Sequence, residues 1–258
     1  MDNFSHILIS VEGPLGMVQL NRPKVLNAIS REMVGELVSA FEHFDNCDDV
    51  RAIVLYGGGR AFAAGADIDE MANESTIDFE LLNQFSDWDR LSKVKKPIIG
   101  AVHGFALGGG FELALSCDIL FAAEDAKFGF PEVNLGVMPG AGGTQRLTKL
   151  IGRTRALEWI WDGEMRTAKE AKELGVVNRL VAPELLVDEA KKYAMKLASK
   201  APLSLRLIKD SVNKAVDYSL YEGMQYERKN FYLLFSSEDQ KEGMKAFIEK
   251  RKPHFRGR

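Results

Sequence analysis

The first two thirds of the chain alternate short apolar runs with longer amphipathic segments. Runs rich in β-branched and other apolar residues, each bounded by Gly, Pro or polar residues, predict strands at 7–11, 17–20, 52–56, 97–103 and 119–123. Apolar side chains at helical spacing predict a helix that ends near Asn46, with Ser30 as its N-cap, and a second helix over 77–93. Strands that alternate with helices are typical of a parallel sheet with crossover helices. We therefore expect an α/β core with the loops at the strands' carboxyl ends on one side.

From Pro183 onward every periodic segment is helical. Helices are predicted over 184–199, 202–216 and 220–235, and Ser237 with Gln240 predicts a capping box for a last helix. This change of pattern predicts a domain boundary near residue 200, with a core over 1–200 and a C-terminal helical domain over 201–258. A helical tail that could cover a neighbouring subunit indicates assembly.

Composition and charge exclude several classes of protein. The 258 residues are 46% hydrophobic and 28% charged, with a net charge of −3, so nothing global attracts nucleic acid. No apolar run approaches the roughly 18 residues of a membrane span. Cys47 and Cys117 are far apart and form no CxxC, which argues against zinc and for a reducing compartment. Because the start, Met1–His6, lacks a leader pattern, we expect a soluble cytoplasmic protein without a metal.

The candidate chemistry centres on the glycine run 104–114. Three consecutive glycines, 108–110, let a ligand approach the backbone and precede a predicted short helix that carries Glu112. A second carboxylate, Glu132, follows Pro131 in similar apolar surroundings. Burial and mutual repulsion of two such groups tend to leave one acid and one base near neutral pH, which could add water across a double bond. The alternatives are a buried structural Glu112 paired with an arginine and a solvent-facing turn residue at Glu132.

Backbone amides supply the other half of such a site. Gly109 at its helix start and Ala66 in a small-residue loop are candidates for two amides that form an oxyanion hole. Tight packing alone is the alternative for these glycine-rich turns. The glycine spacing is not that of a dinucleotide-binding GxGxxG sequence, Ser116 and Cys117 lack a GxSxG turn, and His103 is expected to finish a strand.

These residues resemble the crotonase superfamily, and specifically the enoyl-CoA hydratases. The resemblance covers nearly the whole chain and is carried by the segments Asn21–Ala28, Phe62–Ile68, Gly104–Ala114, Pro131–Leu147 and Asp239–Phe247. It implies ββα units coiled into a spiral core, and a C-terminal helical domain that builds trimers which pair into hexamers.

The resemblance also implies roles for individual residues. The amides of Ala66 and Gly109 would hold the thioester oxygen of a trans-2-enoyl-CoA, while Glu112 and Glu132 would position and activate water for syn addition. The product would be a 3-hydroxyacyl-CoA, and no cofactor is implied, because CoA is part of the substrate. Residues implied in CoA binding are Lys24, Val25, Leu26, Ala64, Ala66, Asp67, Ile68 and Gly109, with Phe247 and Lys250 from a neighbouring subunit.

One departure concerns CoA binding. Many hydratases carry Lys after the Ala-Asp-Ile sequence, whereas this chain has Asp69, so a contact with a CoA phosphate is in doubt there and the basic tail is a candidate replacement. The acyl pocket should border residues 71–93, with Phe85 and Trp88 as candidate lining. We expect a hydratase of short-chain enoyl-CoA in fatty-acid degradation. The alternatives are an enoyl-CoA isomerase or pathway-specific hydratase of the same superfamily, and a non-catalytic acyl-CoA- or RNA-binding relative.

Overall fold

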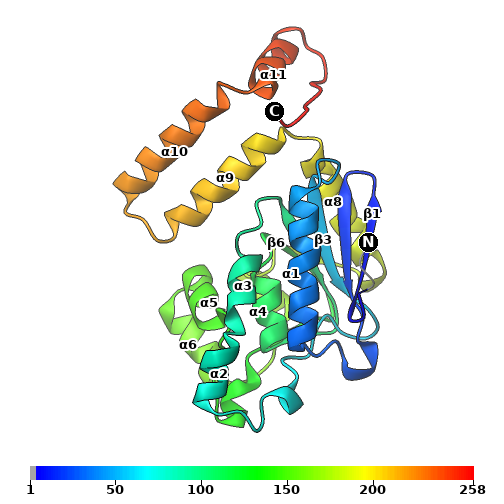
Figure 1. Ribbon diagram of the computed structural model, residues 1–258, viewed down its shortest axis with the longest axis vertical. Helices are drawn as coiled ribbons and strands as arrows, with labels where there is room; N and C mark the ends of the chain where they lie inside the picture. The colour runs from blue at the N-terminus through cyan, green and yellow to red at the C-terminus, as the bar shows by residue number, and fades with distance from the viewer. Residues whose placement is uncertain (1–3) are drawn as a thin grey trace.

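A six-stranded sheet forms the centre of the molecule in the computed structural model, which describes residues 4–258 (Figure 1). Residues 1–3, part of the chain start considered above for a leader, lie outside the described residues. The strand order is β1-β2-β3-β4-β6-β9. Their bounds are β1 Ile7–Glu12, β2 Leu15–Leu20, β3 Ala52–Gly57, β4 Ile98–Val102, β6 Ile119–Ala123 and β9 Arg179–Val181.

The pairing confirms the predicted parallel sheet. Only β1 runs antiparallel to its neighbour, as the first strand of a hairpin with β2, and every following pair is parallel. Helix α1 (Arg31–Asn46) lies in front of the sheet in Figure 1, and α8 (Leu186–Ala198) lies behind it. Because helices cover both faces, β3 and β4 are almost entirely apolar and buried. Ser30 caps α1 as predicted, and its hydroxyl accepts the Met33 amide.

A second, three-stranded sheet explains the coiled path of the chain. It contains β5 (Phe105–Leu107), β7 (Lys127–Gly129) and β8 (Arg166–Thr167). Each pass of the chain gives one strand to the large sheet, one to the small sheet and then a helix: β4, β5 and α4 (Gly109–Leu115), then β6, β7 and α5 (Gly143–Ile151). This is the repeated ββα unit that the resemblance implied.

Within the glycine run 104–114, the three glycines 108–110 therefore follow β5, a strand that the sequence analysis did not predict. The chain turns from the large sheet into the small one at Gly104, whose φ of +58° suits glycine. A Cβ atom at Gly104 would overlap the Arg60 carbonyl oxygen, so this turn also needs a residue without a side chain.

The single helix predicted over 77–93 is also wrong. The segment forms α2 (Thr76–Leu82) and α3 (Phe85–Leu91), separated by Asn83 with a φ of +42°. Asn tolerates this left-handed conformation better than most residues. The backbone amide of Asn83 caps α2 by donating to the Phe79 carbonyl. A helix that the sequence analysis did not predict, α6 (Arg153–Asp162), follows α5 after Gly152. Helix α7 (Ala168–Glu173) begins with a capping box between Thr167 and Glu170.

Three helices, α9 (Pro202–Ala215), α10 (Leu220–Leu234) and α11 (Glu238–Ile248), extend away from the sheets (Figure 1). Helix α9 is joined to the core by Lys209, whose Nζ donates to the Asp118 carboxylate at 2.8 Å and to the Lys96 carbonyl at 3.0 Å. The capping box predicted for α11 is half formed. The Ser237 hydroxyl accepts the Gln240 amide, but the Gln240 side chain turns to Met244. None of the helices within residues 4–258 combines the length and apolar composition needed to cross a membrane.

Two glycine substitutions test how closely the elements approach. A Cβ atom at Gly110 in α4 would overlap the Ala63 carbonyl oxygen, whereas a Cβ atom at Gly35 in α1 would meet nothing within 4 Å. We expect Gly110→Ala to lower the free energy of unfolding by about 1–3 kcal/mol through overpacking. Gly35→Ala should raise it by roughly 0.5–1 kcal/mol through helix propensity. Denaturant unfolding of both variants measures this, and a Gly110→Ala protein as stable as wild type would contradict the close approach.

Candidate active site

The loop after β3 and the start of α4 bring Ala66 and Gly109 together. A Cβ atom built on Gly109 would lie 3.5 Å from the Ala66 nitrogen. The two segments are joined by a bridge between Ala63 and Ala106, in which the Leu107 amide donates to the Ala63 carbonyl at 3.0 Å. Among the backbone hydrogen bonds of residues 4–258, the amides of Ala66 and Gly109 donate none. Both amides are therefore available to a ligand at one place.

A second set of backbone bonds fixes the Ala66 loop from its other side. The Ile29 amide donates to the Gly65 carbonyl at 2.8 Å, and the Asp67 amide donates to the Ile29 carbonyl at 3.0 Å. Gly65 has a φ of +126°, which only glycine adopts readily. The loop is held by residues before and after Ala66, which leaves the Ala66 amide itself free.

Glu112 is a buried carboxylate on α4 with 3% of its surface exposed. Its Oε1 accepts the amides of Ala141 at 2.8 Å and Gly143 at 2.7 Å. Its hydrogen-bond partners are thus backbone amides. They are not an arginine side chain, which was the alternative considered from the sequence. Burial raises the pKa of Glu112, and the amides that bind its ionised form oppose that rise.

Glu132 lies on the other side of the glycine turn, in the 3-10 helix η3 (Pro131–Leu135). A Cβ atom at Gly108 would lie 3.0 Å from its Oε1, so glycine is needed there for the carboxyl group to approach. Its Oε2 is buried and has no hydrogen-bond partner within the described part of the chain. Burial raises the pKa of Glu132 to about 7, and the nearby charge of Glu112 adds to the rise. The solvent-facing turn residue considered from the sequence is therefore not what the structure shows.

A cluster of aromatic side chains borders the Glu112 carboxylate. The rings of Phe111 and Phe130 stack with centroids 4.7 Å apart, and Trp159 and Phe128 pack against Phe111. A Cβ atom at Gly143 would meet both the Phe130 ring and Glu112 Oε1, which shows that ring and carboxylate border the same point. Desolvation by burial is the main cause of the raised pKa of both Glu112 and Glu132.

The start of α3 lies over the loop that binds Glu112. A Cβ atom at Gly140 would come 2.9 Å from Cζ of Phe85, whose ring is partly exposed. Trp88, the other aromatic residue expected to line an acyl pocket, packs against the hydrophobic core. Phe85 is therefore the one of the two that borders the site.

The predicted CoA-binding segments lie side by side. Lys24 and Val25 are exposed in the 3-10 helix η1 (Pro23–Val25), and the Leu26 carbonyl accepts the Ala64 amide at 3.0 Å. Asn27, which the sequence analysis did not single out, is fully buried beneath them. Its Nδ2 donates to the carbonyls of Gly58 and Ala61, at 2.8 Å each.

Asp67 has a partner of its own. Its carboxylate lies 2.9 Å from Nη2 of Arg22, so this side chain joins the η1 segment to the Ala66 loop. Ile68 and Asp69 are exposed in the 3-10 helix η2 (Ile68–Glu70) that follows.

Phe247 and Lys250 lie far from the other predicted site residues. Phe247 is in the last turn of α11 and Lys250 follows two residues after the helix ends. This end of the molecule is opposite the end that contains α2 (Figure 1). The Phe247 side chain is 85% exposed. One chain alone does not bring them to Glu112, and their contact with a neighbouring subunit's CoA stays a prediction.

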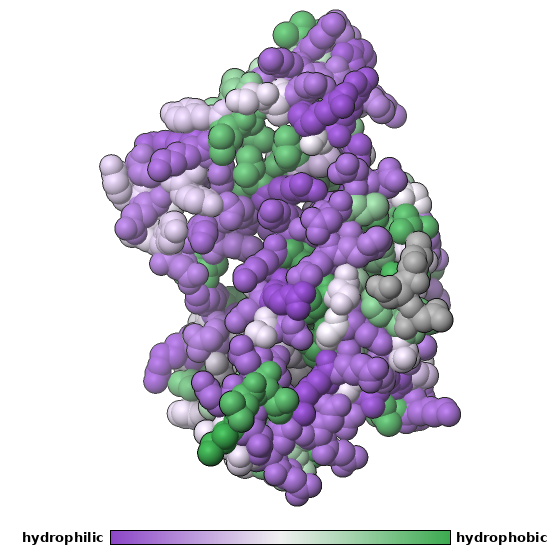
Figure 2. All heavy atoms as spheres, viewed as in Figure 1, coloured by the Kyte–Doolittle hydropathy of each residue, from purple (hydrophilic) through white to green (hydrophobic). Residues whose placement is uncertain are grey.

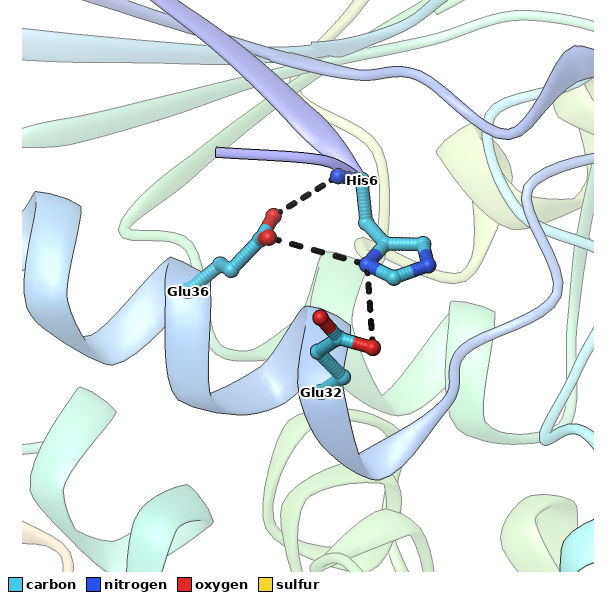
Figure 3. Close-up of side chains that lie close together, drawn as sticks. All are labelled: His6, Glu32 and Glu36. Atoms are coloured by element: carbon cyan, nitrogen blue, oxygen red, sulfur yellow. Dashed lines mark hydrogen bonds and ion pairs between the residues drawn. The ribbon is translucent and has the colours of Figure 1, made fainter. Parts of the chain in front are cut away.

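A cluster of potential metal ligands lies elsewhere, where the chain enters β1 beside α1 (Figure 3). His6 Nδ1 lies 3.8 Å from Glu32 and 3.6 Å from Glu36, and the ligand atoms of the three residues fall within 4.8 Å of one another. Glu36 already accepts the backbone amides of Ser5, His6 and Ile7, and the Glu32 side chain is 67% exposed. The cluster therefore serves to attach the first strand to α1.

The sequence analysis missed the residues that hold Glu112. These residues, Ala141 and Gly143, lie in the glycine-rich segment that leads into α5. The available signal was that α5 has no acidic residue in its first turn, and the structure gives it no side-chain cap among the described residues. A helix start of this kind favours an external carboxylate, which Glu112 supplies.

Comparison with known proteins agrees with this geometry. A family model described as "Enoyl-CoA hydratase/isomerase" matches residues 11–258. A crystal structure of enoyl-CoA hydratase subunit I from Geobacillus kaustophilus HTA426 is 66% identical and superposes with a TM-score of 0.98, with 100% of both chains covered.

Two curated relatives are similar over nearly their full length. A probable enoyl-CoA hydratase of Rhizobium meliloti (strain 1021) is 45% identical over 99% of this chain and 100% of its own. The mitochondrial enoyl-CoA hydratase of Pongo abelii is 46% identical over 98% of this chain and 89% of its own. The chain belongs to the enoyl-CoA hydratase/isomerase family, and its fold is that of the crotonase superfamily.

Proposed function

We propose that this protein is an enoyl-CoA hydratase that adds water to trans-2-enoyl-CoA and forms a 3-hydroxyacyl-CoA. The observation that carries the proposal is the meeting of two free amides, Ala66 and Gly109, with two desolvated carboxyl groups, those of Glu112 and Glu132, at one glycine turn. Acids at both positions favour hydration over double-bond isomerisation, because hydration must both activate water and deliver a proton to carbon.

The environments of the two carboxyl groups suggest different roles. Glu112 accepts two backbone amides, which stabilise its ionised form, so it is the proposed base that orients and deprotonates water. Glu132 has a pKa of about 7 and a buried oxygen without a partner in residues 4–258, so it is the proposed acid. The water oxygen bonds to C3, its proton goes to Glu112, and the proton of Glu132 goes to C2. A proton then returns from Glu112 to Glu132 before the next turnover.

The amides of Ala66 and Gly109 are proposed to stabilise the charge that develops on the thioester oxygen during this addition. Fixed amide donors cost no reorganisation when the charge appears, and removing one such donor typically costs about 10²–10³-fold in kcat. The rest of the CoA is proposed to lie along Lys24, Val25, Leu26, Ala64, Asp67 and Ile68. Asp67 contributes through its backbone, since its carboxylate pairs with Arg22. No cofactor is proposed beyond the CoA of the substrate.

We also propose that the helical segment 201–258 forms a homo-oligomer, as a trimer or a pair of trimers. Large apolar side chains on α9–α11 are exposed and gather over these helices in Figure 2. They include Ile208, Val212, Leu220, Phe231, Leu233, Phe247 and Ile248. An exposed apolar surface of this kind is typical of a protein interface. In such an assembly Phe247 and Lys250 would reach a neighbouring subunit's CoA.

We further propose that the protein acts in the cytoplasm, in the degradation of short-chain fatty acids.

Substitution of each carboxyl group tests the two-acid mechanism. Glu112→Gln and Glu132→Gln should each lower kcat for crotonyl-CoA by about 10²–10⁴-fold, the range of general acid–base catalysis. The loss of enoyl-thioester ultraviolet absorbance measures hydration, and Glu158→Gln, an exposed glutamate on α6, is the matched control. Near wild-type hydration by both variants would refute the mechanism. A wild-type protein that binds CoA esters but hydrates no enoyl-CoA would refute the enzymatic function.

The raised pKa of Glu132 predicts the pH dependence of activity. Because the acid must carry a proton, kcat/KM should fall as the pH rises through about 7. At lower pH it should also fall, as Glu112 becomes protonated. A pH–rate profile of the wild type measures both limbs, and a profile that stays level from pH 6 to 9 would contradict the proposed acid.

Stability offers a check on the same pKa that does not need activity. The carboxyl group ionises near 4.5 when unfolded and near 7 when folded, so the folded state binds more protons between these values. The contribution of Glu132 to stability is therefore present below pH 4.5 and is lost as the pH rises through about 7. The stability of Glu132→Gln relative to wild type should increase from pH 5 to pH 8, and a constant difference would count against the raised pKa.

A further inference from the structure

A cavity of about 240 Å³ lies where the C-terminal segment meets the core, away from the carboxyl groups of the active site. Its walls come from three parts of the chain that are distant in sequence. Arg51 and Lys96 come from the segments entering β3 and β4, Pro202 and Arg206 come from α9, and Arg256 comes from the C-terminal tail. A ligand in this cavity would therefore touch the core, α9 and the tail at once.

Two arginines of this cavity have no acidic partner in the described chain, although a third, Arg258, pairs with Glu238 at 3.2 Å. Arg51 donates to the carbonyls of Ala198 and Phe255, so its partners carry no full negative charge. The guanidinium of Arg206 makes no hydrogen bond or ion pair in the part of the chain that the structure describes, and its Nε is buried without a partner. Arg206 as a whole is partly buried, and partial burial of an unpaired cation removes water without supplying an opposite charge.

Lys96 and Arg206 also repel each other. The Lys96 ammonium donates to the carbonyls of Phe44 and Cys47 at 2.6 Å each. Burial lowers the pKa of Lys96, and the charge of Arg206 lowers it further, against weaker opposing effects that include Asp45 and Asp48. Asp48 is the one acid among the lining residues, and it faces several cations. The cavity therefore has a surplus of positive charge.

The start of α9 adds to this field. Pro202 and Leu205, from its first turn, line the cavity. Within the described residues this helix start has no side-chain cap, and its first turn has no acidic residue. Its free amides and the positive end of its dipole thus reinforce the cationic side chains.

We propose that this cavity is a binding site for a phosphate-sized oxyanion, which neutralises Arg206 and joins α9 and the C-terminal tail to the core. The volume favours a small anion, because sites for drug-sized ligands usually enclose about 300–1,000 Å³. Arginine guanidinium groups and helix amides are the groups that bind phosphate oxygens in proteins. A bound anion stabilises the folded chain by mass action, so its effect is measurable as a rise in Tm.

Inorganic phosphate is the probe, titrated in the low millimolar range at an ionic strength held constant with chloride. This range limits the general stabilisation that concentrated phosphate gives to any protein. Wild-type Tm should rise by a few degrees and saturate, and titration calorimetry should give a matching Kd. Arg206→Gln should abolish the rise, and Arg155→Gln, an exposed arginine on α6, should retain it.

Arg206→Gln has a second signature. Without phosphate it should be at least as stable as wild type, because the substitution removes the repulsion with Lys96. Arg256→Gln, at an exposed position of the tail, tests the site without disturbing the core and should raise the phosphate Kd several-fold. Hydration of crotonyl-CoA without phosphate should be unchanged in all three variants. The proposal is overturned if wild type shows no saturable response, or if Arg206→Gln and Arg256→Gln both respond as wild type does.

Discussion

The close approach of the Ala63–Ala66 loop to the glycine turn is the contact on which the site depends. The Ala63 carbonyl accepts the Leu107 amide, and the absence of a side chain at Gly110 allows that carbonyl to lie against α4. Neither the Ala66 amide nor the Gly109 amide is used in holding the segments together within residues 4–258. The backbone therefore brings two donors to one place and leaves them free, which is the arrangement required of an oxyanion hole.

The surroundings of the same turn give the two carboxyl groups different tendencies to ionise. Burial desolvates both, and Glu112 also accepts the amides of Ala141 and Gly143 at the entry to α5. Glu132 approaches from the other side across Gly108, with a buried oxygen that has no partner in the described chain. Burial raises the pKa of both groups, and their unequal hydrogen bonding stabilises the ionised form of Glu112 more than that of Glu132.

Much of this arrangement was predictable from sequence, because local patterns determine much of it. Apolar runs located β3, β4 and β6, and residue types in apolar surroundings identified Glu112 and Glu132. Strand β5 was missed because three residues between two glycines are too short for a periodic signal. The break between α2 and α3 depends on one backbone conformation at Asn83, which hydrophobic spacing does not report. The amides that bind Glu112 lie 29 and 31 residues further along the chain, so only the tertiary structure brings them together.

A crystal structure with a non-reactive acyl-CoA thioester tests the central claim most directly. The account predicts that the thioester oxygen lies about 2.7–3.1 Å from both the Ala66 and the Gly109 nitrogen atoms. C2 and C3 of the acyl group should then lie between Glu112 and Glu132. A thioester oxygen that contacts neither amide, or an acyl group bound away from the glycine turn, would contradict it.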